Sequence, residues 1–486
     1  MSNELSKLQP SAMWTIFGEI CSIPHPSKKE EKIREYVVNW AKEHGISVKV
    51  DEVGNVILKK PATPGMENRR GVILQGHLDM VPQKNNDTAH DFEKDPILPR
   101  IDGEWVKATG TTLGADNGIG VAAAMAVMQA KDLVHGPLEC LFTIDEETGM
   151  TGAFGLKPGL FEGDILMNLD SEDEGELYIG CAGGINAAAQ FAYTDAAVPA
   201  NHLAYKVVVK GLKGGHSGVD IKLGRANSNK LLVRYLYHAA KKYQLKLAAV
   251  DGGSLRNAIP RESMAVVLIP AEHEAKFKEC VKHYEGVFKG EYSALEPDLE
   301  FFAENAPMPA SVMDEKSMKA FLMAAYSCPN GVISMIPDMP EVVQTSNNMA
   351  IMKSENGKLT VNCLLRSSAE TAKDDLANMI ECVFTMGGAK VDFDGSYPGW
   401  KPNVHSPILT TMQDIYQKRF GKVPEVKVIH AGLECGLLGG VYPNWDMISF
   451  GPTIRFPHSP DEKVNIATVQ LFWDFLVETL KSVPAK

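Results

Sequence analysis

The sequence predicts an α/β protein: a mostly parallel mixed sheet with helices on both faces, into which a two-layer α/β domain is inserted. Three observations lead to this prediction. Short apolar runs alternate with helical stretches over the first part of the chain, the pattern of a sheet covered by helices. The pattern changes in the middle and returns near the end. The chain also has 486 residues, more than one core usually supports.

The first elements in the chain follow recognisable start and stop signals. Ser27-Lys-Lys-Glu30 has the pattern of a capping box, and the apolar residues behind it recur at helical spacing up to Gly45. A glycine-rich turn at Gly114–Gly118 opens a second, Ala/Met-rich helix. Strand-like runs cover residues 47–53, 55–59, 71–75, 138–144 and 165–169.

The middle of the chain has a different organisation. Alternating strands predicted at 203–209 and 264–269 bracket a long helix, and a hairpin is predicted around Glu355-Asn-Gly357. The predicted helices cover about 225–242, 274–288 and 370–386. After Trp400 the buried-strand pattern returns. We therefore predict an outer domain of residues 1–186 and 400–486 and an inserted domain of residues 187–399.

Composition narrows the classes of function. The chain is 44% apolar and 23% charged, with a formal net charge of −12 and no basic run, which argues against a nucleic-acid partner. No apolar run reaches the roughly 20 residues of a membrane span, and the N-terminus lacks a signal pattern. The eight cysteines include no CxxC pair and are expected to be reduced thiols. We expect a cytoplasmic protein without a membrane partner.

Acidic residues and histidines follow the ends of the apolar runs. His77 and Asp79 follow one run, Asp145-Glu-Glu147 the next, and Asp170 the third. His458 follows another buried run far downstream. Ligand sites of open α/β sheets lie outside the carboxyl ends of the strands. We therefore expect these side chains to converge.

The residue types favour a metal site. Imidazole and carboxylate groups are ligands of divalent metals. Asp116 could cap its helix or bridge two cations, and a buried strand-end carboxylate such as Asp170 needs a partner. Glu146 and Glu147 point in opposite directions in extended backbone, so one could bind metal while the other faces an attacking water. Each residue alone has an ordinary interpretation as a loop or capping residue.

Five motifs carry a resemblance to a known family. They are Gly76-His-Leu-Asp-Met80, Gly114-Ala-Asp-Asn-Gly118, Asp145-Glu-Glu-Thr-Gly149, Asn168-Leu-Asp-Ser-Glu-Asp173 and the proline-flanked His458. In order and spacing they resemble the co-catalytic di-zinc metallopeptidases related to carnosinase, glutamate carboxypeptidase and the bacterial tripeptidase. The segment His430–Gly436 and the long insertion resemble the aminoacyl-histidine dipeptidase (peptidase D) group. The resemblance covers essentially the whole chain.

The resemblance implies a cytoplasmic dipeptidase with two zinc ions, for which cobalt or manganese could substitute. Its substrates would be unblocked dipeptides, Xaa-His and others. The implied ligands are His77 and Asp170 for one ion, Glu147 and His458 for the other, and Asp116 as the bridge. Asp79 would hold the ring of His77, and Glu146 would be the general base. In related enzymes the peptide bond after the bridging aspartate is cis.

The resemblance also makes the inserted domain a lid that pairs two copies into a homodimer. His216 would hold the carbonyl oxygen as it becomes an oxyanion, Asn257 would touch the substrate, and Arg366 would bind its carboxylate, which suits bidentate arginine pairing. His430 and Glu434 lie in a segment that differs from many relatives, and Glu434 would meet the free amine. From the residues alone, His216 is a hairpin-loop histidine and Asn257 a turn residue.

Two alternatives stay open from the sequence. One is a related zinc carboxypeptidase or N-acyl amino acid amidohydrolase, which a requirement for a free substrate amine would distinguish. The other is a metal-holding but inactive scaffold. The presence of Glu146 argues against a scaffold, because loss of the base is the simplest route to inactivity.

Overall fold

The structure is a computed structural model, and it describes residues 4–486. Residues 1–3, the start of the predicted outer domain, lie outside the described part. The chain forms two compact units. Unit 1 consists of the chain up to Cys181, Trp400–Val428 and Leu433–Lys486, and unit 2 of Ala182–Gly399 and Ile429–Gly432.

The units differ in two respects from the predicted division. Unit 2 begins at Ala182 rather than at 187, and it includes the short segment Ile429–Gly432, which we had assigned to the outer domain. Backbone hydrogen bonds explain this placement, because Ala182 N donates to Ile429 O (3.0 Å) and to Ala431 O (3.1 Å). His430 therefore belongs to unit 2.

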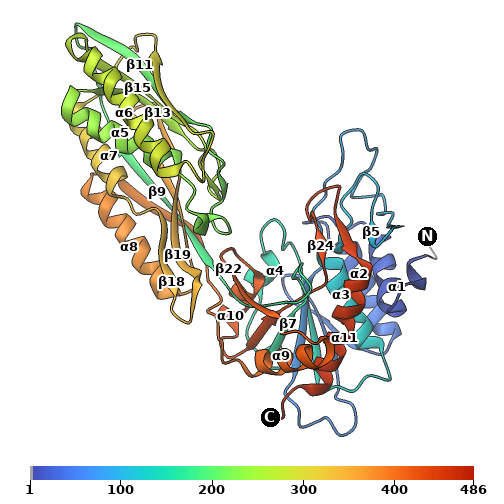
Figure 1. The fold of residues 1–486 in the computed structure, drawn as a ribbon. Coiled ribbons are helices and arrows are strands. Elements are labelled where there is room, and N and C mark those ends of the chain that lie inside the picture. Colours follow the sequence, from blue (N-terminus) through green and yellow to red (C-terminus); the bar gives the residue numbers. More distant parts are fainter. Residues whose placement is uncertain (1–3) are drawn as a thin grey trace. The chain divides into compact units, whose positions relative to one another are not determined.

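An eight-stranded mixed sheet forms the centre of unit 1 (Figure 1). Its strands are, in spatial order, β1 (Ser47–Val50), β2 (Val56–Lys60), β6 (Leu138–Thr143), β3 (Val72–His77), β7 (Ile165–Asn168), β23 (Asp446–Ser449), β8 (Glu176–Cys181) and β22 (Glu425–Ile429). The four central strands β6, β3, β7 and β23 run parallel, whereas β1–β2, β2–β6 and β23–β8 pair antiparallel. The predicted fold class is confirmed.

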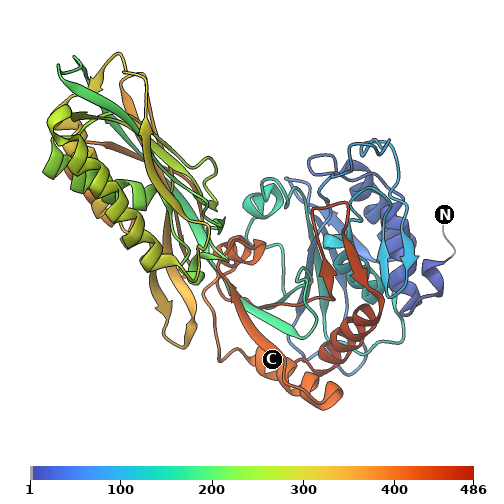
Figure 2. The ribbon, with the colours of Figure 1, turned by 45° about the horizontal axis from the view of Figure 1, so that its top comes forward.

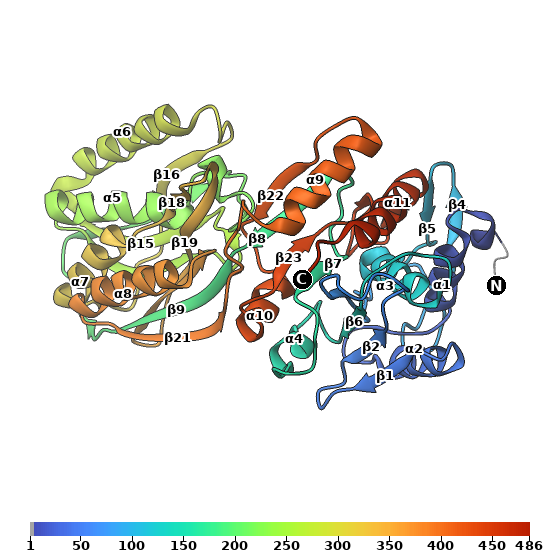
Figure 3. The same cartoon turned by 90° about the horizontal axis from the view of Figure 1, so that it is seen from below.

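The parallel strands β3, β6 and β7 are buried along their whole lengths. Helices explain this burial, because they lie on both sides of the sheet: α1 and α3 on one side, α4 and α10 on the other (Figure 3). The helices of unit 1 are α1 (Ser11–Cys21), α2 (Glu31–Glu43), α3 (Ala115–Gln129), α4 (Thr151–Gly155), α9 (Pro407–Phe420), α10 (Glu434–Val441) and α11 (Ile466–Ser482), with a 3-10 turn at Leu5–Lys7.

The capping box predicted for α2 is wrong. The Ser27 hydroxyl donates to Met80 O (3.3 Å), and the Glu30 carboxylate accepts from the backbone N–H groups of Lys28 (2.7 Å) and Asp145 (3.1 Å). The helix begins only at Glu31. The local pattern was present, but both side chains bond to the loops around the strand ends instead.

A second, smaller sheet in unit 1 brings the end of the chain back towards its start. It has the order β24 (Ile454–Arg455), β25 (Lys463–Asn465), β5 (Trp105–Lys107) and β4 (Arg100–Asp102). β24 and β25 pair antiparallel, so the loop between them, which carries His458, is the loop of a hairpin.

Unit 2 is a two-layer α/β structure, with a nine-stranded antiparallel sheet that carries its helices on one face (Figure 2). The strand order is β16 (Glu300–Asn305), β11 (His202–Lys210), β15 (Ser263–Pro270), β13 (Lys246–Gly252), β19 (Met339–Glu355), β20 (Lys358–Ser367), β9 (Gly183–Ala192) and β21 (Lys390–Tyr397), with β18 (Gly331–Ile336) on β19. The helices are α5 (Ser228–Tyr243), α6 (Glu274–Tyr292), α7 (Glu315–Ser327) and α8 (Glu370–Met386). One apolar core fills the space between the layers.

Shorter elements complete unit 2. They are the paired strands β10 (Asp195–Ala196) and β17 (Val312–Met313), the paired strands β12 (Gly215–His216) and β14 (Ala258–Ile259), and 3-10 turns at Ile221–Leu223 and Ala271–His273. The predicted helices and the β19–β20 hairpin are present, whereas β9, β13, β16, β18 and α7 were not predicted. Across residues 4–486, no helix combines the length and the apolar character that crossing a bilayer requires.

Candidate metal centre and candidate substrate residues

The polar residues that follow the strands of unit 1 converge. Two groups of potential ligands, His77 with Asp116 and Asp170, and Asp116 with Glu147 and His458, each have donor atoms within 4.8 Å of one another. Asp116 is common to both groups. The convergence arises because β3, β6 and β7 run parallel side by side and end at the same edge of the sheet.

His77 lies at the end of β3 with its side chain almost fully buried. Its Nδ1 contacts Asp79 O (3.0 Å) and Asp79 Oδ1 (3.4 Å), and its Nε2 lies 3.2 Å from Asp116 Oδ1 and 3.5 Å from Asp170 Oδ1. Both acceptors on Asp79 favour the tautomer that carries its proton on Nδ1. Nε2 is then left to face a cation.

Asp116 sits at the start of α3, where the backbone departs from helical geometry and the Asp116–Asn117 peptide bond is cis. The Asn117 side chain bonds the ends of two strands, donating to Leu169 O (2.7 Å) and accepting from His77 N (3.3 Å). A side chain at Gly76 would not fit, because a Cβ there would lie 2.2 Å from Asn117 Oδ1. The turn is therefore packed tightly against the strand that carries His77.

Glu147 and His458 form the second group with Asp116. His458 Nε2 lies 3.0 Å from Glu147 Oε2 and 3.2 Å from Asp116 Oδ2. The His458 side chain is 52% exposed, whereas that of Glu147 is 5% exposed. Of the three ligands in this group, the histidine from the hairpin loop is the one open to solvent.

Asp79 organises both the histidine and the two glutamates. Its Oδ1 accepts from Glu146 N (2.9 Å) and its Oδ2 from Glu147 N (3.2 Å), so one carboxylate fixes the backbone of the 145–147 loop. Burial raises the pKa of Asp79, but the hydrogen bond and the charge of His77 and the N–H of Glu146 outweigh it and hold that pKa at about 2. A Glu146 oxygen lies within 4.8 Å of donor atoms of His77 and Glu147.

The donor set fits divalent metal. Asp170 Oδ1 and Glu147 Oε1 are buried without a hydrogen-bond partner in the described part of the chain. Burial, with further contributions from neighbouring carboxylates, raises the pKa of Asp170 to about 7 and that of Glu146 well above its usual range. The negative charges of carboxylates crowded in this way are not compensated by the protein, and a bound cation would compensate them.

Glu434 lies beside this cluster, at the start of α10. Its Oε2 accepts from Gln75 Nε2 (2.6 Å) and Thr143 Oγ1 (2.8 Å), whereas its buried Oε1 has no partner within residues 4–486. Burial raises the pKa of Glu434 to about 7. One oxygen is thus fixed by the sheet, and the other remains available to a donor.

The remaining residues predicted to bind substrate, His216, Asn257, Arg366 and His430, all lie in unit 2. His216 Nδ1 accepts from the N–H groups of Gly218 (3.2 Å) and Val219 (3.1 Å). Because Nδ1 is an acceptor, the ring carries its proton on Nε2. Burial and the nearby Arg366 lower the pKa of His216, which favours the neutral ring. His216 therefore offers an N–H donor.

Arg366 and His430 form a buried polar cluster within unit 2. Arg366 Nη1 donates to the Tyr397 hydroxyl (3.0 Å), and His430 Nε2 contacts the Ser346 hydroxyl (2.8 Å). Arg366 Nε, His430 Nδ1 and the hydroxyl of Ser217 are buried without a partner among the described residues. The cluster can therefore accommodate an additional hydrogen-bonding group.

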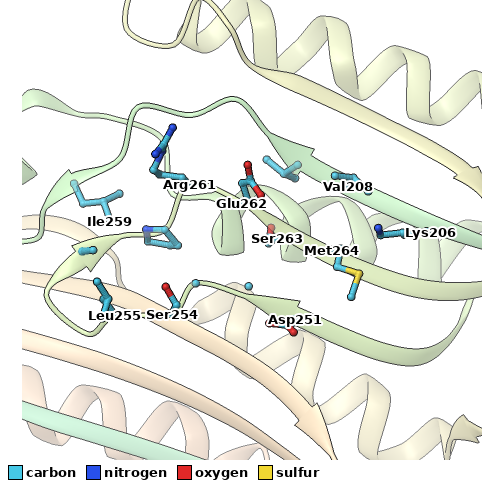
Figure 4. A pocket seen from close by; sticks show the side chains of 15 residues that line it. Lys206, Val208, Asp251, Ser254, Leu255, Ile259, Arg261, Glu262, Ser263 and Met264 are labelled. Atoms are coloured by element: carbon cyan, nitrogen blue, oxygen red, sulfur yellow. The ribbon is translucent and has the colours of Figure 1, made fainter. Parts of the chain in front are cut away.

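Asn257 is exposed, and its carbonyl accepts from Ser217 N (2.8 Å). A pocket of about 610 Å³ on unit 2 is lined by Leu255 and Ala258 of the same segment, but not by Asn257 itself (Figure 4). Lys206, Arg261, Asp251 and Glu262 balance its charge, and it is lined by none of the predicted site residues. We therefore place the candidate site on the donor-atom clusters and not on this pocket.

The sequence interpretation missed several residues that support the site. Asn117, Gln75, Thr143 and Glu462 bond directly to the backbone or side chains of predicted site residues. Gln75 on β3 and Thr143 on β6 are buried polar residues in strands that we predicted only from their apolar residues. A polar residue inside an apolar run was the signal that could have identified Gln75 and Thr143.

Known proteins resemble this chain over its whole length. Residues 73–482 match peptidase family M20/M25/M40. The chain is 49% identical to the cytosol non-specific dipeptidase of Escherichia coli (strain K12), over 100% of both chains. It is 52% identical to the aminoacylhistidine dipeptidase of Vibrio alginolyticus, whose crystal structure superposes with a TM-score of 0.97 over 100% of this chain and 99% of that one.

A tripeptidase structure from Staphylococcus aureus shares the fold alone, with a TM-score of 0.56 at 15% identity over 98% of this chain and 99% of that one. The match to the family covers most of the sequence, and the two relatives at about half identity extend over all of it. This chain belongs to peptidase family M20/M25/M40.

Proposed function

We propose that this chain is a metal-dependent dipeptidase that hydrolyses unblocked dipeptides, Xaa-His and others. The observation that carries the proposal is the gathering of two histidines and three carboxylates into two donor groups that share Asp116, with Glu146 beside them. The relatives at 49% and 52% identity, which are named as dipeptidases, support the same activity.

Each donor group would hold one ion. In this assignment His77 and Asp170 would hold one, Glu147 and His458 would hold the other, and Asp116 would contribute to both. Mixed imidazole and carboxylate ligands suit zinc, and cobalt or manganese could occupy the same donors. Asp170 Oδ1 and Glu147 Oε1 accept no hydrogen bond within residues 4–486, which supports the assignment because both oxygens could then bind metal.

Glu146 is the general base of the proposed reaction. Two bound cations supply charge that lowers the pKa of a water towards about 7 and polarises the substrate carbonyl. The Glu146 carboxylate takes the proton from the attacking water and delivers it to the nitrogen of the leaving amine. Asp79 supports this role by holding the Glu146 backbone N–H and the ring of His77.

The ends of the dipeptide meet separate groups in this proposal. Glu434 binds the free amine through its unpartnered Oε1, and Arg366 binds the free carboxylate. His216 donates from Nε2 to the carbonyl oxygen as negative charge develops there. Asn257 and His430 complete the substrate contacts. Unit 2 then acts as a lid that supplies four of these five residues.

We further propose a cytoplasmic homodimer that pairs through unit 2. Within residues 4–486, strand β18 of unit 2 pairs only with β19, and its Val332, Ile333 and Met335 are 37–39% exposed. This is the kind of apolar edge that a second copy would cover. The compartment follows the name of the Escherichia coli relative. Sedimentation equilibrium tests the pairing: a monomer at micromolar concentration would contradict it.

Metal removal tests the main proposal. The protein is stripped with a chelator, its metal content is measured by elemental analysis, and hydrolysis of a free dipeptide is followed before and after zinc, cobalt or manganese is added back. We expect activity to disappear with the metal and to return with it. Full activity in protein shown to hold no metal would overturn the proposal.

A further inference from the structure

One carboxylate outside the proposed ligand set holds the turn that carries Asp116. Glu462 is 2% exposed, and its Oε2 accepts from Leu113 N (2.7 Å) and Gly114 N (3.0 Å). Its Oε1 accepts from Ala115 N (2.7 Å) and Asp116 N (3.2 Å). Four consecutive backbone N–H groups thus point at a single side chain from the other end of the sequence.

These four N–H groups include the start of α3, which begins at Ala115. The first N–H groups of a helix have no partner within it, and the side chain of the N-cap residue usually accepts from one of them. Here the N-cap residue Gly114 provides no side-chain cap. Glu462 does the capping, so the Asp116 carboxylate can face His77 Nε2 (3.2 Å) and His458 Nε2 (3.2 Å).

Glu462 also belongs to the loop that carries His458. The loop connects β24 with β25, and Glu462 N donates to Ser459 O (2.9 Å), which closes the loop behind the histidine. Half of the His458 side chain is exposed, and its ion-pair contacts within residues 4–486 are with Asp116 and Glu147. Little else therefore fixes the imidazole, and the anchoring of its loop decides where it lies.

We propose that Glu462 is a positioning residue of the metal centre. Its carboxylate joins the Asp116 turn to the His458 loop, and in doing so it sets the affinity for the ion that Asp116, Glu147 and His458 share. The inference rests on the proposed metal centre and adds to it a residue that touches neither metal nor substrate.

Metal titration of the stripped protein tests this role. Cobalt or zinc is titrated by isothermal calorimetry into wild type, Glu462→Gln and a control, and the cobalt absorption spectrum reports the ligand geometry. The control is Glu139→Gln: Glu139 is also a buried carboxylate of unit 1, 5% exposed, whose Oε2 accepts from Glu162 N (3.0 Å) and Gly163 N (2.7 Å). It contacts none of the proposed ligands in the described part of the chain.

We expect two ions in wild type and in Glu139→Gln. In Glu462→Gln the ion held by Asp116, Glu147 and His458 should bind about 10- to 100-fold more weakly, the range seen when groups that orient metal ligands are removed. The other ion, which shares Asp116 but not His458, should be weakened less. Circular dichroism and the unfolding temperature of the metal-free proteins report folding. Glu462→Asp keeps the charge on a side chain shorter by one methylene group. Its affinity for the ion held by Asp116, Glu147 and His458 should lie between those of wild type and Glu462→Gln.

The outcomes separate the two proposals. If wild type does not bind two ions, the metal centre itself is wrong. If wild type binds two and Glu462→Gln binds both with unchanged affinity and an unchanged cobalt spectrum, the role of Glu462 is wrong. It is also wrong if Glu139→Gln weakens binding equally, or if neither Glu462 variant folds without metal, because the carboxylate then serves only the fold.

Discussion

His458 Nε2 lies 3.2 Å from Asp116 Oδ2, although 342 residues separate the two in the sequence. The metal-centre hypothesis requires this approach, since a ligand from the last part of the chain must reach a turn near its beginning. The β24–β25 hairpin makes the approach, because β25 pairs with β5, the strand that precedes the Asp116 turn.

Replacing the proposed general base should slow turnover strongly while the protein keeps its bound metal. We expect Glu146→Gln to lower kcat by roughly 10²- to 10⁴-fold, the usual contribution of a positioned base, because the amide cannot accept the proton of the attacking water. Metal content, measured by elemental analysis, should stay at the wild-type value. Steady-state hydrolysis of a free dipeptide provides the rate.

An exposed glutamate of the same unit is a suitable control. Glu67→Gln removes the same charge from a surface loop and should leave kcat unchanged. A Glu146→Gln protein that retains wild-type turnover at full metal occupancy would show that Glu146 is not the base.

Much of the fold could be predicted from the sequence because the buried strands are recognisable as short apolar runs. The runs at 71–75, 138–144 and 165–169 became β3, β6 and β7 with bounds shifted by a few residues. A strand that is buried on both faces has a nearly continuous run of apolar residues, which is easy to recognise in the sequence. In unit 2, α7 and β18 were missed, and β18 carries exposed apolar residues rather than a clear alternation.

The candidate site was predictable only where residue type reveals chemistry. His77 and Asp170 stand out as polar residues at the ends of apolar runs, and Asp116 as a carboxylate in a glycine-rich turn. Glu462 does not, because its role depends on N–H groups that converge only after folding. The capping box at Ser27–Glu30 failed for the same reason: tertiary partners took both side chains away from the helix end.

Recognition of the substrate carboxylate should depend on Arg366. The wild type should prefer a dipeptide with a free C-terminus over its C-terminal amide, and Arg366→Met should reduce that preference in kcat/KM by roughly 10- to 150-fold. This corresponds to the about 1.5–3 kcal/mol of a hydrogen bond to a charged group. Arg234→Gln, which changes a surface arginine paired with Glu291, should keep the preference. An unchanged acid-to-amide ratio in Arg366→Met would exclude this role.

Recognition of the substrate amine should depend on Glu434. The buried Oε1 lacks a partner among residues 4–486, and an ammonium group beside it would favour the charged carboxylate. Glu434→Gln keeps the shape and can still accept from Gln75 and Thr143, but loses the charge. We expect the ratio of kcat/KM for a free dipeptide over its N-acetylated form to fall by about tenfold or more. Equal wild-type rates on both substrates would instead favour the N-acyl amino acid amidohydrolase.

The buried ring of His430 should make folding sensitive to mild acid. Burial, together with the charge of Arg366, lowers the pKa of His430 to about 3. In the unfolded chain a histidine has a pKa of about 6.5, so between pH 3 and 6.5 the unfolded state binds more protons and stability falls as the pH falls. The slope approaches about 1.4 kcal/mol per pH unit, and the loss at pH 5 is about 2 kcal/mol relative to pH 7.

Urea denaturation of the metal-free protein at pH 5, 6 and 7 measures this effect without interference from metal binding. His430→Asn removes the titrating group, so its free energy of unfolding should vary less with pH than that of wild type by about 2 kcal/mol over this range. His283→Asn changes an exposed histidine of the same unit and should keep the wild-type slope. If His430→Asn and wild type lose stability in parallel between pH 7 and 5, the ring takes up its proton as readily in the folded protein as in the unfolded chain.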